Sequence, residues 1–195
     1  MAKPNQALIE KELTVHTYSE LWHASDCVLK KGISDSKASS WQFLSSIMLI
    51  AFSFEAFLNH AGEHVFSSWN ELERLPPLGK FSLLCEKLKV NISRGDRPRS
   101  TIFELFTFRD SIAHGKTKRL SKSETRDVND QLDAYLGERL LIDWQSKIRT
   151  SDFALRARED AEKVMTLLHN ARPRPKEALF TFGMGTHSAS LIKEG

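Results

Sequence analysis

Cysteine is scarce in this sequence: its 195 residues contain two cysteines, Cys27 and Cys85, which lie far apart. There is no C-x-x-C pair, which excludes the common cysteine zinc sites and dithiol redox motifs. Both cysteines lie among apolar helix positions, which indicates buried free thiols in a reducing compartment. The longest apolar run, Ile47 to Phe52, is too short to span a bilayer. The first residues lack a signal-peptide core, so we expect a cytoplasmic protein with no membrane partner.

Proline and strand-like segments are also sparse, which predicts an all-α fold. The six prolines leave long segments with helical periodicity between them, and no alternating segment before residue 179 indicates a strand. We expect a bundle of four to six helices in one domain over residues 17–172, after an extension over 1–16. Residues 173–195 form a tail that is disordered or docked on a partner, in which LFTF could be a short strand. The expected helices span residues 17–30, 36–66, 76–90, 101–114, part of 121–140, and 151–170.

A large excess of charge is missing as well, because the net charge is only +3. Basic residues nevertheless gather on both sides of one short stretch, FRDSIAHG, at residues 108–115. Five precede it and four follow it: Lys87, Lys89, Arg94, Arg97 and Arg99, then Lys116, Lys118, Arg119 and Lys122. Such clusters can hold phosphate groups, although solvated charge at loops and helix ends gives the same pattern.

The FRDSIAHG stretch itself has the residue types of an acid–base site. On a helix, Asp110 and His114 are four residues apart and share a face, so the carboxylate could accept a hydrogen bond from the imidazole. Gly115 would end the helix and place His114 at the carboxyl end, where the helix dipole favours a positively charged ring. Arg109 is a permanent charge that can bind phosphate. The same residues could equally serve packing and helix capping alone.

The arrangement R-x4-H resembles the signature of the HEPN superfamily (higher eukaryotes and prokaryotes nucleotide-binding domain). The order around it is also similar: the leucine-rich PPLGKFSLLCEKLKV, then the basic NISRGDRPRS, then TIFELFTFRDSIAHG. Glu55 and Asn59 in SFEAFLNHAGEH match a glutamate and an asparagine that recur in the family's long helix. The resemblance covers about residues 17–170. It implies a bundle of four or five helices that forms a homodimer with two motifs across one cleft.

The resemblance also implies a metal-independent endoribonuclease without a cofactor, which leaves 2′,3′-cyclic phosphate ends on RNA such as tRNA or mRNA. His114 would then act as general acid or base, and Arg109 would hold the scissile phosphate. Asp110 would orient one of them, with Glu55, Asn59 and Ser111 in support. Lys116, Lys118 and Arg119 would bind flanking phosphates. The implied setting is a toxin or antiphage system with an antitoxin or defence partner. A catalytically inactive HEPN-like binding or scaffold module is the alternative.

A rival motif lies at the end of the second expected helix. His60, Glu63 and His64 match H-x-x-E-H, the zinc pattern of inverted metallopeptidases. The two histidines could share a zinc ion on one helix face, but no downstream segment is built to supply the third ligand. A short motif of this kind arises easily by chance, so we expect no metal site. No phosphate-binding glycine loop or G-x-S-x-G nucleophile motif is present.

Overall fold

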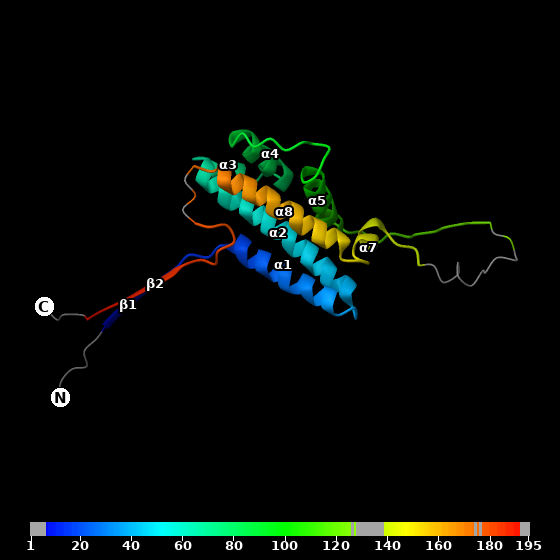
Figure 1. Ribbon diagram of the computed structural model, residues 1–195, viewed down its shortest axis with the longest axis horizontal. Helices are drawn as coiled ribbons and strands as arrows, with labels where there is room; N and C mark the ends of the chain where they lie inside the picture. The colour runs from blue at the N-terminus through cyan, green and yellow to red at the C-terminus, as the bar shows by residue number, and fades with distance from the viewer. Residues whose placement is uncertain (1–6, 126, 128–138, 174, 176, 192–195) are drawn as a thin grey trace, which may run out of the picture.

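The fold is mostly helical, with one small sheet made by the two ends of the chain (Figure 1). A computed structural model describes residues 7–125, 127, 139–173, 175 and 177–191. With the labels of Figure 1, the elements in order are β1 Ala7–Leu13, α1 Thr17–Ser34, α2 Ser39–Val65, α3 Trp69–Leu72, α4 Pro77–Lys87, α5 Arg99–Ala113, α7 Asp143–Lys147, α8 Asp152–Ala171 and β2 Gly185–Leu191.

Helix α2 is the centre of the bundle, and α1, α4, α5 and α8 all pack against it. Phe54, Phe57 and Leu58 are fully buried there, as the apolar periodicity of this segment predicts. By length and composition α2 could also cross a membrane, but half of its most apolar window is buried inside the bundle. A core helix of this kind confirms the predicted helical bundle.

The first helix is longer than the expected span of residues 17–30. Helix α1 continues to Ser34, and Gly32 is buried inside it. A Cβ atom at Gly32 would lie 2.8 Å from Cε1 of Phe43 on α2. The glycine is therefore needed because α1 and α2 approach each other closely, not because the chain turns.

The sequence pattern missed two short helices, α3 and α7, and overextended others by a few residues. Pro77 opens α4 at its first turn, where the missing N–H is harmless. Of the segment 121–140, residues 121–125, 127 and 139–140 are not helical. The remainder of that expected helix lies outside the described residues. Cys85 is buried, and burial raises the pKa of its thiol to about 11. Cys27 is exposed, contrary to expectation.

The two ends of the chain form an antiparallel ribbon that projects from the bundle (Figure 1). Strand β1 pairs with β2 over its whole length, from Ala7 with Leu191 to Leu13 with Gly185. The expectation of no strand before residue 179 is therefore wrong, and the strand in the tail follows LFTF instead of containing it. The segment before β2 is tied to α1, because Phe180 stacks on Trp22 with ring centroids 4.7 Å apart. The tail thus docks on its own chain.

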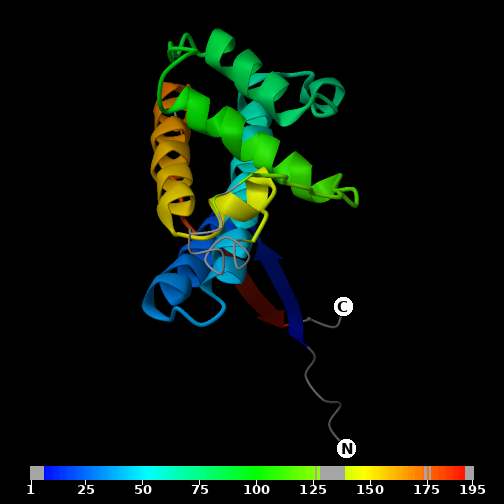
Figure 2. The same ribbon diagram turned by 90° about the vertical axis from the view of Figure 1, so that its right-hand side faces the viewer.

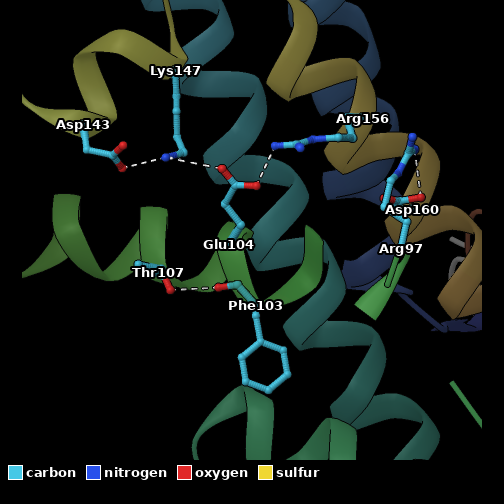
Figure 3. A network of polar contacts seen from close by, with 8 residues as sticks. All are labelled: Arg97, Phe103, Glu104, Thr107, Asp143, Lys147, Arg156 and Asp160. Atoms are coloured by element: carbon cyan, nitrogen blue, oxygen red, sulfur yellow. Dashed lines mark hydrogen bonds and ion pairs between the residues drawn. The ribbon is translucent and has the colours of Figure 1, made fainter. Parts of the chain in front are cut away.

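Ion pairs between α5, α7 and α8 fix the position of α5. Glu104 lies between Lys147 of α7 and Arg156 of α8 (Figure 3). In the loop before α5, Arg97 binds Asp160 of α8 at 2.7 Å. Burial alone would raise the pKa of Asp160, but hydrogen bonds from Arg97 and Thr101 outweigh it and lower the pKa. Figure 2 shows α5 running across the bundle between α4 and α7, with its carboxyl end free of both. This end carries the FRDSIAHG stretch.

Candidate functional site

Phe108 anchors the FRDSIAHG stretch in the core. It is 2% exposed and packs beside Phe153 of α8, with ring centroids 5.7 Å apart. Helical geometry then directs the next residue, Arg109, toward α2 and places Asp110 in solvent. The alternation of apolar and charged residues in this stretch therefore follows the boundary between the core and the surface of α5.

Arg109 is held between two carboxylates. Its Nη2 donates to Glu55 of α2 at 3.1 Å, and its Nη1 lies 3.0 Å from Asp110. Its guanidinium also lies over the ring of Phe106, 5.5 Å from the ring centre. The Arg109 side chain is 17% exposed and its Nε has no hydrogen-bond partner in the described part of the chain. The Glu55 carboxylate thus accepts a hydrogen bond from Arg109, and the Asp110 carboxylate forms an ion pair with its other terminal nitrogen.

A buried lysine extends this cluster to α4, and sequence reasoning missed it. Lys80 Nζ donates to Asn59 at 2.8 Å and lies 3.9 Å from Glu55. The Lys80 side chain is only 4% exposed. The sequence holds one sign of this burial: a lysine stands directly before Phe81, in a helix whose other buried residues are apolar. Glu55 and Asn59, which the resemblance singled out, therefore join Arg109 in one network across three helices. We call Arg109, Asp110, Glu55, Asn59 and Lys80 the Arg109 cluster.

His114 stands apart from the Arg109 cluster within one chain. It follows the last helical residue, with φ −111° and ψ 24°, and its backbone N–H donates to the Asp110 carbonyl at 2.9 Å. The side chain is exposed and makes no hydrogen bond to another described residue. The expected contact between the Asp110 carboxylate and the imidazole is wrong. The carboxylate binds Arg109 instead, and the non-helical backbone at His114 takes its ring off the helical face.

The remaining expected site residues are exposed and outside the cluster. Ser111 donates its hydroxyl to the carbonyl of Phe108 at 2.7 Å, which is a local helix contact. Lys116, Lys118 and Arg119 lie on the segment that leaves the carboxyl end of α5 and runs away from the bundle (Figure 1). No carboxylate among the residues described by the structure pairs with any of these three. They remain free to meet an anionic partner.

The H-x-x-E-H motif belongs to a different, more buried cluster. His60 Nε2 lies 2.9 Å from Glu177 Oε1 and 3.1 Å from Arg172 Nη1. His64 donates from Nδ1 to the carbonyl of His60 at 2.8 Å, and Glu63 points to solvent. Within the described ranges, no three His, Cys, Asp or Glu residues are grouped so that they could hold a metal ion. The geometry therefore does not support the zinc peptidase alternative.

Arg172 is the centre of this second cluster, which we call the Arg172 cluster: Arg172, Glu177, His60, His169 and Tyr18. The Arg172 side chain is 1% exposed and donates from Nη2 to both Glu177, at 2.6 Å, and His169, at 2.7 Å. Burial alone would raise the pKa of Glu177, but hydrogen bonds from Arg172 and His60 outweigh it and lower the pKa to about 2. Burial lowers the pKa of His60 and of His169, and raises that of Tyr18.

Comparisons of the chain with known protein families, with curated proteins and with solved structures find no match. The site must therefore be interpreted from its own geometry. The Arg109 and Arg172 clusters differ in whether the histidine beside them is exposed and makes no hydrogen bond to another described residue. The Arg109 cluster lies beside an exposed, unbonded His114, whereas the Arg172 cluster uses His60 and His169 as internal partners.

Proposed function

We propose that the chain is a HEPN-like, metal-independent RNA endonuclease that acts as a homodimer, with Arg109 and His114 at its active site. The observation that carries the proposal is the contrast inside one short motif. Arg109 is fixed by the Glu55 carboxylate of the neighbouring helix α2 and by the Asp110 carboxylate beside it on α5, while His114, five residues on, is exposed at the end of the helix. A rigid cation for phosphate and a free imidazole for proton transfer are the two parts that RNA cleavage requires.

In this mechanism the RNA 2′-hydroxyl attacks the adjacent phosphorus while His114 accepts its proton. A new bond forms between O2′ and phosphorus, and the bond from phosphorus to O5′ breaks. The departing O5′ takes that proton from the imidazolium of the same His114, which leaves a 2′,3′-cyclic phosphate and a 5′-hydroxyl. The free N–H groups of Arg109 hold the non-bridging oxygens as negative charge develops on them. Asp110 and Glu55 position Arg109, and Lys116, Lys118 and Arg119 bind flanking phosphates.

A dimer explains how the two parts of the motif meet. Arg109 reaches from α5 toward α2, whereas His114 lies just beyond the end of α5 and is exposed, so their side chains do not meet in one chain. Two copies with their α5 ends in contact would bring Arg109 of one protomer opposite His114 of its partner. The substrate of this composite site would be tRNA or mRNA, in a toxin or antiphage role with an antitoxin or defence partner.

The test is cleavage of total RNA and purified tRNA by wild type and His114→Ala in EDTA, with end-group analysis. We expect cyclic phosphate and 5′-hydroxyl ends from the wild type. The variant should be inactive at an unchanged unfolding temperature, because the His114 side chain makes no described hydrogen bond. His64→Ala is the matched control, since this exposed histidine also lies in the last turn of a helix. Equal cleavage by wild type and His114→Ala would refute the assignment.

Complementation tests the shared site separately. Arg109→Ala and His114→Ala should each be inactive, while their mixed dimer holds one intact site made from both chains. Random exchange of subunits should therefore restore about a quarter of the wild-type rate. A mixture that exchanges subunits and stays inactive would place the whole reaction in one protomer.

A second candidate function, an inactive HEPN-like binding module, is favoured by one specific feature. Arg109 already contacts two carboxylates and is 17% exposed, so the cluster could serve only to join α2 to α5. In that case Arg109→Ala would lower the unfolding temperature, and no preparation would cleave RNA. The proposed endonuclease and this module are thus separated by the same EDTA cleavage assay.

A further inference from the structure

Two adjoining hollows lie at the other end of α5, where the end of α4, the loop over residues 91–98 and the start of α5 meet. Their volumes are about 480 and 500 Å³, and Ser82, Arg94 and Arg99 line both. Lys89 and Asn91 complete the first hollow, and Phe103 lines the second. Glu86 is the one acidic residue that lines either of them. We call the combined hollow the Arg99 pocket.

Arg99 is a buried cation without an acidic partner. The residue is 8% exposed, its Nη2 donates to Ser82 Oγ at 3.1 Å, and its Nε has no hydrogen-bond partner in the described part of the chain. The other buried or half-buried arginines whose contacts the structure describes each have a carboxylate within 4.0 Å: Arg109, Arg156, Arg158 and Arg172. A buried charge is costly unless an opposite charge compensates it. The guanidinium of Arg99 lies 5.2 Å from the centre of the Phe81 ring and 5.9 Å from that of Phe103, but no carboxylate among the described residues pairs with it.

Contacts on both sides of Arg94 hold the loop beside Arg99 in place, and the Arg94 side chain is exposed. Arg97 is tied to Asp160 and Glu159 of α8, and the Ser93 hydroxyl donates to Asp96 at 2.9 Å. Arg94 lies between these anchors, is exposed, and makes no ion pair with a residue that the structure describes. One buried and one exposed guanidinium thus line a single pocket, with Lys89 nearby. A phosphate group satisfies such a set of donors.

Phe103 adds an aromatic surface to the same pocket. Its side chain is 42% exposed, and Figure 3 shows it on the face of α5 turned away from the ion pairs of Glu104. Arg99 and Phe103 are four residues apart and share this face of the helix. Nucleic-acid bases stack on exposed aromatic rings, and a phosphate beside the ring completes the recognition of one nucleotide.

We propose that the Arg99 pocket binds a nucleotide of the same single-stranded RNA that is cleaved at His114. This inference rests on the proposed function and extends it to the substrate. Arg99 and Arg94 would hold the phosphate, and Phe103 would stack on the base. The pocket and His114 are fifteen residues apart along α5, a distance of about 22 Å, so several nucleotides lie between the two sites. The enzyme would then prefer a single-stranded segment over a dinucleotide.

The test measures binding of a fluorescent 12-nucleotide single-stranded RNA to full-length protein that carries His114→Ala, so that cleavage does not interfere. Arg94→Gln and Phe103→Leu should each weaken binding by about tenfold, since both side chains are exposed and neither supports the core. Arg99→Gln should weaken it at least as much. Lys37→Gln is the control, because Lys37 is an exposed cation on the turn between α1 and α2, far from α4 in both ribbon views (Figures 1 and 2). It should change binding by less than about twofold.

A second arm uses inorganic phosphate, which does not depend on RNA. Millimolar phosphate should raise the unfolding temperature of the wild type, but not that of Arg99→Gln, relative to chloride at equal ionic strength. RNA binding that is unaffected by Arg94→Gln and Phe103→Leu would overturn the proposal, as would an equal phosphate effect in wild type and Arg99→Gln. Neither readout involves cleavage, so failure of the pocket and failure of the endonuclease are separate results.

Discussion

The Arg109 and Arg172 clusters are built from the same residue types, but they leave their histidines in opposite states. In the Arg172 cluster, the half-buried His60 and the buried His169 both contact the arginine, and Glu177 completes the set. In the Arg109 cluster, Glu55 and Asp110 bind the arginine, and His114 is left in solvent. Short motifs in the sequence marked both places, yet only the Arg109 cluster lies beside a histidine that is exposed and makes no hydrogen bond to another described residue.

This difference shows that the hydrogen-bond partners of a histidine decide whether it is available for proton transfer, and that the short motif around it does not. Burial lowers the pKa of His60 and of His169, so these rings stay neutral and serve as hydrogen-bonding partners. They hold the segment that carries Glu177 against the end of α8. We therefore interpret the Arg172 cluster as structural and the Arg109 cluster as functional.

Among the changes that leave His114 in place, the largest expected effect is on RNA cleavage by the Arg109 cluster. Arg109→Ala should lower the rate of RNA cleavage by about 10²–10³-fold, because it removes the cation that stabilises the developing charge. Arg156→Ala is the matched control, since Arg156 is also a half-buried arginine that binds a carboxylate between helices. Single-turnover rates should stay within about threefold of wild type in the control. Equal losses in the two variants would indicate a general structural effect.

The next largest expected effect is on the free energy of unfolding that the Arg172 cluster contributes, and it depends on pH. The lowering of the Glu177 pKa from 4.5 to about 2 corresponds to about 3 kcal/mol of stability at neutral pH. Because the pKa is depressed in the fold, this contribution is complete above pH 4.5 and is lost as the pH falls toward 2. Burial also lowers the pKa of His60 and His169, so stability should begin to fall below their ordinary pKa of 6.5.

Urea unfolding of wild type and Glu177→Gln at pH 7, 5 and 3 measures this dependence. The free energies of unfolding should differ by about 3 kcal/mol at pH 7 and by about half of that at pH 3, and they should converge only near pH 2. A constant difference across this range would contradict the role assigned to the Glu177 carboxylate. RNA cleavage at pH 7 should remain in the folded fraction of the variant.

A smaller effect is expected from the residue that positions Arg109. Glu55→Gln keeps the shape of the side chain but removes the charge that binds Arg109 and faces Lys80. We expect kcat to fall by about tenfold with little change in KM, because Arg109 loses its fixed orientation but keeps its charge. Asn59→Ala, which frees Lys80 without touching Arg109, is the comparison. A larger loss in Asn59→Ala than in Glu55→Gln would assign the main role to Lys80.

The smallest effect concerns the basic segment after α5. Replacing Lys116, Lys118 and Arg119 together by alanine should weaken RNA binding. The slope of the logarithm of the RNA-binding constant against the logarithm of salt concentration should become shallower by about 2. The kcat at saturating RNA should not change, because these side chains lie outside the Arg109 cluster. A lower kcat with unchanged salt dependence would show that this segment takes part in the reaction itself.

The sequence predicts the positions of the helices better than it predicts the side-chain contacts between them. The apolar repeats at three and four residues place α2, α4, α5 and α8 within a few residues of their observed ends. The resemblance placed Glu55 and Asn59 near Arg109, whereas Lys80 looked like an ordinary helix charge. The partner of Asp110 could not be predicted, because both Arg109 and His114 are within its reach and the backbone at His114 decides between them.

The contacts that sequence reasoning missed involve residues far apart in the chain. Glu177 and His60 lie on segments that nothing in their local pattern connects. Strand β1 contains the charged run Glu10 to Glu12, and only its pairing with β2 makes it a strand. Arg99 reads as one of several loop cations, and its burial appears only when α4 and α5 pack together. Local periodicity carries no information on such contacts.

The most direct test compares His114→Ala with His60→Ala in one preparation, by RNA cleavage rate and unfolding temperature. His114→Ala should lose about 10²–10⁴-fold in rate and keep the wild-type unfolding temperature. His60→Ala should unfold several degrees lower and, at a temperature where it is folded, cleave RNA at nearly the wild-type rate. The reverse result, with cleavage lost in His60→Ala and retained in His114→Ala, would contradict the assignment of the reaction to the Arg109 cluster.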